Sequence, residues 1–295
     1  MNNNNLLNHD DEIDFKALFF ALWSRKLFIT SITSLAAIIS VLYALSLPNL
    51  YISSAMLAPS ESKDSSMSSN LGGLSSMAGL AGINLSSSGS QSDEAMARIR
   101  SYDFFVEQFL PNINLDDLVK AKNWDKSSNK VIYDISDSKS IRKVSNQEAF
   151  EVYRSILSLS VDTKTSFTII TIEHVSPYIA QQWLKIIIKS INDHMRELDK
   201  DLAKNSIEFL KTSYQETNLT EIKKVISKLI QNQIQTLTLA EVNKDYIFKQ
   251  IVSPIAPEKK SSPSRSMICI LGTFSGFMIS ILFCLSMHFI RLAKD

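Results

Sequence analysis

The chain has 295 residues, of which 31 are basic and 30 acidic, and 45% are hydrophobic. A nucleic-acid binder carries a basic surplus, so this near-neutral charge argues against nucleic acid as a partner. Five of the seven glycines lie between residues 72 and 89 and two lie in a C-terminal apolar segment, so a glycine-rich nucleotide-binding loop is hard to place.

Two uncharged segments, residues 27–47 and 267–290, predict two transmembrane helices. Each exceeds the roughly 20 residues that an α-helix needs to cross a hydrocarbon core of about 30 Å. The first segment could instead be a cleaved signal peptide. It follows an acidic leader and is longer than the usual apolar region of a signal peptide, so we interpret it as a retained anchor.

Basic residues set the expected orientation. Lys16, Arg25 and Lys26 precede the first segment, and the next basic residue is Lys63. The positive-inside rule then predicts a cytoplasmic leader (1–26), an external domain (48–266) and a cytoplasmic tail (291–295). Both cysteines, Cys269 and Cys284, lie in the second segment, so the external domain has to rely on packing or assembly instead of disulfides.

The external domain begins with a predicted strand at 50–57 and a Ser/Gly-rich loop at 60–92. Leucines and methionines interrupt this loop, and the pattern leaves open an apolar loop docked on the domain or a disordered tether. Helices are predicted at 93–109, from Asn114 to Lys122, and after a capping box of Ser145 and Glu148. Strands at 157–163 and 166–173 complete the prediction of an α/β (α+β) domain.

The longest predicted element is a helix at 176–214, with Ser176 as N-cap and Pro177 at its first position. Unbroken, it would be about 57 Å long at roughly 1.5 Å per residue and would project beyond its own domain. A second helix, capped by Asn218 or Thr220, could fold back on it. The apolar stripe fits either ordinary core packing or contacts between protomers, for which Leu198 and Leu202 are the interface candidates.

A strand at 246–252 precedes a proline-rich segment at 253–266. Pro254, Pro257 and Pro263 favour extended geometry, which predicts a stiff stalk or a simple linker. Small residues recur every four positions in both membrane segments, which would let two helix backbones approach closely unless the spacing is incidental. These residues are Ala36, Ser40 and Ala44 in the first segment and Gly272, Gly276 and Ser280 in the second.

The sequences DFKALFFALWSRKLFI and YIFKQIVSPIAPEKKSSPSR, each leading into a membrane segment, resemble the Wzz family of polysaccharide co-polymerases, the O-antigen chain-length determinants. Pro254, Pro257 and Pro263, followed by Gly272 and Gly276, are similar to the family's proline- and glycine-rich signature. The resemblance implies a homo-oligomeric ring in a Gram-negative inner membrane, with its main domain in the periplasm. It also implies an O-antigen polymerase and the growing lipid-linked polysaccharide as partners, with no catalysis by the chain itself.

No enzyme motif contradicts that expectation. The sequence has no Walker A motif, no His-Glu-x-x-His, no nucleophile elbow, and four scattered histidines (His9, His174, His194 and His288). We interpret the carboxylate pairs Asp116–Asp117 and Asp199–Asp201 as solvated helix faces. We therefore expect no catalytic residue, no cofactor and no metal.

Three other functions fit the sequence less well. A capsule co-polymerase fused to a tyrosine kinase would need a nucleotide-binding domain after Ile290, whereas a capsule co-polymerase with a separate kinase and export channel is the main alternative. A two-span sensor would need an intracellular output domain. A membrane-anchored glycosyltransferase or hydrolase would need a catalytic constellation.

Overall fold

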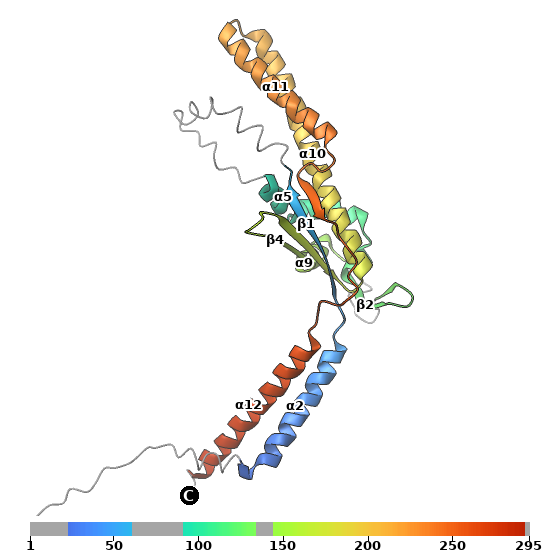
Figure 1. Ribbon diagram of the computed structural model, residues 1–295, viewed down its shortest axis with the longest axis vertical. Coiled ribbons are helices and arrows are strands. Elements are labelled where there is room, and N and C mark those ends of the chain that lie inside the picture. Colours follow the sequence, from blue (N-terminus) through green and yellow to red (C-terminus); the bar gives the residue numbers. More distant parts are fainter. Residues whose placement is uncertain (1–22, 61–90, 134–143, 293–295) are drawn as a thin grey trace, which may run out of the picture. The chain divides into compact units, whose positions relative to one another are not determined.

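The computed structural model describes residues 23–60, 91–133 and 144–292 (Figure 1). Most of the predicted leader, most of the Ser/Gly-rich loop and the end of the predicted tail lie outside these residues, as does His9. The chain divides into two compact units, Asn49–Ser261 and the residues before and after it. The flanking unit contains the helices α2 (Lys26–Ser46) and α12 (Arg265–Leu292). Both are long and apolar enough to cross a membrane, with mean hydropathies of 2.0 and 2.3 over their candidate spans.

The second unit is built on a four-stranded antiparallel sheet in the order β4-β5-β1-β6. The strands are β1 (Tyr51–Pro59), β4 (Leu157–Val161), β5 (Thr168–His174) and β6 (Phe248–Val252). Tyr51 pairs with His174 at one end of the sheet and Leu57 with Thr168 at the other. All four strands were predicted, with ends that differ by no more than two residues.

One face of this sheet carries the core. Ile170 and Ile172 of β5 and Leu57 of β1 are fully buried, and they alternate with more exposed residues. That alternation is typical of an antiparallel sheet covered on one side. An aromatic cluster of Phe105, Phe109, Tyr153 and Trp183 packs into the same core, and Tyr153 donates a hydrogen bond from its hydroxyl to the Ile99 carbonyl at 2.8 Å.

Shorter helices surround the core, and two of their predicted extents were wrong. The single helix predicted at 93–109 divides into α5 (Gln91–Ile99) and α6 (Tyr102–Phe104), because Ser101 accepts a hydrogen bond from the Phe104 amide and starts a new helix. A π-helical turn (Phe105–Phe109) and a 3-10 turn (Leu110–Asn112) follow.

The helix predicted from Asn114 to Lys122 also ends early. Asn114 caps it as predicted, but α7 (Leu115–Val119) gives way to a hairpin of β2 (Ala121–Asp125) and β3 (Lys130–Tyr133). The predicted cap at Ser145 is confirmed, because its hydroxyl accepts a hydrogen bond from the Glu148 amide at the start of α9 (Asn146–Ile156).

The long helix is confirmed as one unbroken element, α10 (Pro177–Glu216), of 40 residues. At about 1.5 Å per residue it is roughly 60 Å long. Its first half covers the buried face of the sheet, and α11 (Thr220–Val242) folds back along its second half, well beyond the sheet (Figure 1). Leu219 occupies the N-cap position of α11, in place of the predicted Asn218 or Thr220.

Asn192 fixes α10 to the last strand. This side chain is 4% exposed, and its Oδ1 accepts hydrogen bonds from the amides of Ile247 and Phe248, both at 2.9 Å. Its Nδ2 donates to the carbonyls of Phe248 and Ile188 at 3.1 and 3.2 Å. Every polar atom of this buried amide therefore has a hydrogen-bond partner. At the start of β6, the Asn192 side chain takes the place of a neighbouring strand as the partner of the backbone groups.

Replacing this amide should destabilise the second unit. In Asn192→Leu the two amides that Oδ1 accepts from lose their partner in a buried site, which predicts a loss of about 2–4 kcal/mol in the free energy of unfolding. Thermal and chemical denaturation of the purified chain, followed by far-UV circular dichroism, measures it. Asn205→Leu, at an exposed position of the same helix, is the matched control. Equal stability of the two variants would contradict the proposed role of Asn192.

Candidate functional site

The helices α2 and α12 pack against each other in antiparallel orientation. Arg25 contacts the Met287 sulfur at 3.7 Å, and the rings of Phe28 and Phe283 stack at 5.8 Å. At the other end, Arg265 donates a hydrogen bond to the Leu47 carbonyl at 3.4 Å. The chain therefore enters α2 and leaves α12 at the same end of the pair.

Small residues lie where these two helices meet. A methyl group added at Gly272 would overlap the Ser40 side chain, and one added at Gly276 would overlap the Ala36 side chain. The Ser40 hydroxyl also donates a hydrogen bond to the Ile268 carbonyl at 3.0 Å, across the helix pair. Ala44 and Ser280 are buried as well. The structure thus brings the predicted small-residue faces together within one chain.

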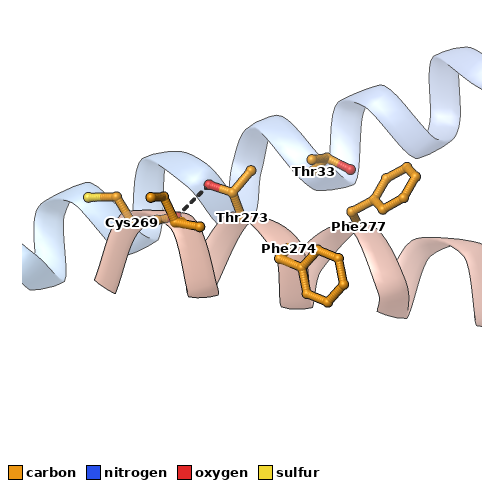
Figure 2. Close-up of a pocket in the computed structure, with 6 residues that line it drawn as sticks. Thr33, Cys269, Thr273, Phe274 and Phe277 are labelled. Carbon is orange, nitrogen blue, oxygen red and sulfur yellow. Dashed lines mark hydrogen bonds between the residues drawn. The ribbon is translucent and has the colours of Figure 1, made fainter. Parts of the chain in front are cut away.

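An apolar groove of about 490 Å³ runs along the same helix pair (Figure 2). Its lining comes from Thr33 of α2 and from Cys269, Ile270, Thr273, Phe274 and Phe277 of α12. Both threonine hydroxyls donate to carbonyls of their own helices, Thr33 to Ile29 and Thr273 to Cys269. The groove therefore presents a hydrocarbon-like surface with its threonine hydroxyls already engaged.

Replacing both glycines of α12 by leucine should separate α2 from α12. Both segments would remain apolar enough to insert into a membrane. Cysteines introduced at Arg25 and Met287, with Cys269 and Cys284 changed to serine, would report the pairing through an intrachain crosslink by a bis-maleimide, whose spacer replaces the two long side chains that meet there. We expect the Gly272→Leu/Gly276→Leu variant to lower the crosslinked fraction severalfold. Ser275→Leu adds comparable bulk at an exposed position of α12 and should leave it unchanged. Full crosslinking in the double variant would rule out close packing at these glycines.

The proline-rich segment lies along the second unit instead of standing free from it. Gln181 of α10 donates a hydrogen bond to the Pro254 carbonyl, and Ser53 of β1 donates to the Ile255 carbonyl, both at 2.9 Å. The Ser261 amide donates to the Leu50 carbonyl at 2.8 Å. Residues up to Ser261, including the half-buried Pro257, thus belong to the unit, whereas Pro263 lies just before α12.

The second half of α10 exposes much of its apolar stripe. Of the α10 residues after Met195, all of which the structure describes, Ala203 alone is buried. Leu198 is 40% and Leu202 65% exposed, so neither interface candidate belongs to the core of its own chain. Other large apolar side chains exposed on the two-helix hairpin are Phe209, Tyr214, Leu219, Ile222, Val225, Leu229, Ile234 and Val242. An apolar surface of this kind is typical of a contact with another molecule.

The histidine and carboxylates singled out in the sequence make structural contacts. His174 accepts a hydrogen bond from the Ser176 amide at Nδ1, so its Nε2 carries the proton that is donated to the Asp117 carbonyl at 2.9 Å. The Tyr133 hydroxyl donates to the Asp117 carboxylate and the Tyr246 hydroxyl to Asp199. Asp116 pairs with Lys120. Within the described ranges, no three His, Cys, Asp or Glu side chains are grouped closely enough to hold a metal ion.

Burial lowers the pKa of His174 below its ordinary value of 6.5. Below pH 6.5 the unfolded chain therefore takes up a proton that the folded chain does not, and stability falls with pH by up to about 1.4 kcal/mol per pH unit. We expect the melting temperature to fall between pH 7.5 and 5.5, and to fall less in His174→Gln. His194→Gln, at a less buried histidine, should retain most of the dependence. Identical pH profiles for the wild type and His174→Gln would contradict this.

Comparison with known proteins gives one family and a set of solved structures. Residues 11–102 match the family model Wzz, described as chain length determinant protein. A structure described as a full-length bacterial polysaccharide co-polymerase is 13% identical, with 94% of this chain and 98% of that chain covered and a TM-score of 0.42. A fragment of WzzB, the polysaccharide co-polymerase from Salmonella Typhimurium, is 15% identical, with 72% and 100% covered and a TM-score of 0.30. No curated protein matches the sequence. The family match confirms the predicted resemblance for residues 11–102.

Proposed function

We propose that this chain, which carries a Wzz chain length determinant domain in residues 11–102, is a non-enzymatic co-polymerase that sets the length of O-antigen chains. The observation that carries the proposal is the match to that family on a chain in which one α/β unit is joined at both ends to candidate membrane helices. A regulator of a membrane polymerase needs this anchoring, because its partner and the lipid-linked substrate are confined to the same membrane.

We propose that the unit Asn49–Ser261 lies in the periplasm and that both termini lie in the cytoplasm. Lys16, Arg25 and Lys26 before the first span support this orientation through the positive-inside rule. The antiparallel packing of α2 and α12 is consistent with it, because the chain enters and leaves the helix pair at one end. The membrane is then the bacterial inner membrane, where O-antigen chains are polymerised on their lipid carrier.

Assembly into a homo-oligomeric ring would cover the exposed apolar stripe of α10. Among the described residues, Leu198 and Leu202 are left 40% and 65% exposed. Identical neighbours would supply an apolar surface of the same kind at every position of a closed ring. The ring is proposed to organise the O-antigen polymerase and the growing lipid-linked polysaccharide, while the polymerase alone catalyses chain growth. The hydrogen bonds of Asp117, Asp199 and His174 support a non-catalytic role, since each side chain is engaged in a structural contact.

Deletion of the gene tests the function, and one substitution tests the mechanism. Lipopolysaccharide from the deletion strain should run as a decaying ladder of short chains on gels, and the wild-type gene should restore a clustered band distribution. Leu202→Lys would place a charge in every copy of the interface, so we expect it to reduce crosslinked oligomers. It should also change the chain length at which the lipopolysaccharide bands cluster. Asn205→Lys adds the same charge at an exposed polar position of α10 and should behave as the wild type.

The outcomes separate the two parts of the proposal. An unchanged lipopolysaccharide pattern in the deletion strain, with no second determinant present, would overturn the O-antigen function, and a changed capsule would favour the alternative with a separate kinase. An intact oligomer with unchanged chain length in Leu202→Lys would remove this interface while leaving the function in place.

A further inference from the structure

The chain enters and leaves the second unit at the same end. The Ser261 amide donates a hydrogen bond to the Leu50 carbonyl, and the Ile52 amide donates to the Ser261 hydroxyl at 3.2 Å. Tyr51 follows the last residue of α2, Ser46, by five positions. Four residues, 47–50, therefore separate the first strand of the unit from a candidate membrane helix.

Three aromatic side chains cluster at this end. Trp124 of β2 lies with its ring 5.6 Å from that of Tyr51 and 6.0 Å from that of Tyr178 in the first turn of α10. Its Nε1 donates a hydrogen bond to Asn129 across the hairpin, and Tyr178 is 52% exposed. Tryptophan and tyrosine are the residues enriched at the boundary between membrane and water, where an apolar ring and a polar group are both accommodated.

Basic side chains accompany the aromatic ones. Lys122, Lys126 and Lys130 are exposed on the β2–β3 hairpin, whose one acidic residue, Asp125, is engaged by the hydroxyls of Ser127 and Ser128, both at 2.7 Å. Ile132 of the same hairpin is 50% exposed. Lys259 and Lys260 are also exposed, directly before Ser261 where the chain leaves the unit, and Glu258 opposes them. Lysines beside exposed apolar and aromatic side chains complement an anionic lipid surface.

We propose that the β2–β3 hairpin, with Tyr51 and Tyr178, is a membrane-surface contact that binds anionic phospholipid headgroups through its lysines. This inference rests on the proposed two-span anchoring, but not on the control of chain length.

A sugar chain is the competing ligand, because aromatic rings also stack on pyranose faces. The lipid is favoured by two observations that a neutral saccharide does not explain. The cluster lies at the tethered end of the unit, and the hairpin that carries Trp124 has three exposed lysines and one acidic residue, Asp125.

Tryptophan fluorescence of the full chain in nanodiscs tests the contact. The chain has three tryptophans, Trp23, Trp124 and Trp183, so the difference between Trp23→Phe and Trp23→Phe/Trp124→Phe isolates the signal of Trp124. In nanodiscs that contain phosphatidylglycerol, phospholipids brominated near the headgroup should quench this signal, and aqueous acrylamide should quench it weakly. In nanodiscs of phosphatidylcholine alone, the quenching by brominated lipid should fall severalfold.

Charge variants identify the lysines while keeping Trp124 in place. Lys126→Gln/Lys130→Gln, in the Trp23→Phe background, should lower the ratio of docked to free hairpin at least about tenfold in anionic nanodiscs. Lys164→Gln is the matched control, because Lys164 is exposed in the β4–β5 turn, at the sheet end where Leu57 pairs with Thr168, opposite the end where Tyr51 pairs with His174. Far-UV circular dichroism should be identical for all three proteins.

Three results would overturn the proposal. One is quenching of Trp124 by brominated lipid that is no stronger than that of the buried Trp183. Another is equal quenching in anionic and neutral nanodiscs. The third is protection of Trp124 from acrylamide by a soluble polysaccharide without quenching by lipid, which would assign the cluster to a saccharide. A failure of chain-length control with normal lipid quenching would affect only the proposed function.

Discussion

The pairing of the first and last strands of the second unit sets the geometry of the whole chain. β1 follows the first candidate membrane helix and β6 precedes the second, and the two strands are antiparallel neighbours. The start of β1 and the end of β6 therefore lie together, and the Ser261–Leu50 hydrogen bond fixes this point. Because both connections leave from one place, α2 and α12 can pack as an antiparallel pair with small residues between them.

The exposed apolar surface at the other end of the second unit results from how α10 is attached to the sheet. Asn192 and Gln181 bind α10 to β6 and to the segment after it, while Trp183 and its apolar neighbours bury the helix on the sheet. Beyond Met195 the helix has no sheet to cover, so its apolar residues face α11 or solvent. One element thus joins a stable core to an apolar surface that the described residues of one chain leave exposed, which is the arrangement that favours assembly.

Periodicity and composition were sufficient for most of this architecture. The absence of glycine and proline between Tyr178 and Glu216 predicted one unbroken helix, and the two uncharged segments predicted α2 and α12. Helix caps were harder to predict. Ser101 interrupts the predicted 93–109 helix by capping α6, but in the sequence it looks like any polar residue on a helix surface.

Long-range contacts were not accessible from the sequence. Asn192 is a polar residue within the apolar stripe of α10, and its role depends on amides 55 and 56 residues away. The prolines predicted a stiff stalk, but the carbonyls of Pro254 and Ile255 bind side chains from α10 and β1. The aromatic end of the hairpin likewise combines residues from three separate segments, and none of the three forms a motif by itself.

The strand order also determines when the unit can finish folding. β1 occupies an inner position of the sheet although it is the first strand made, and its partner β6 begins at Phe248, 189 residues after β1 ends at Pro59. Contacts of such large sequence separation form slowly. The sheet is therefore completed only after nearly all of the unit has been synthesised, immediately before α12. After β5 has been made and until β6 follows, β1 keeps one of its two edges unpaired, and β5 alone covers the other.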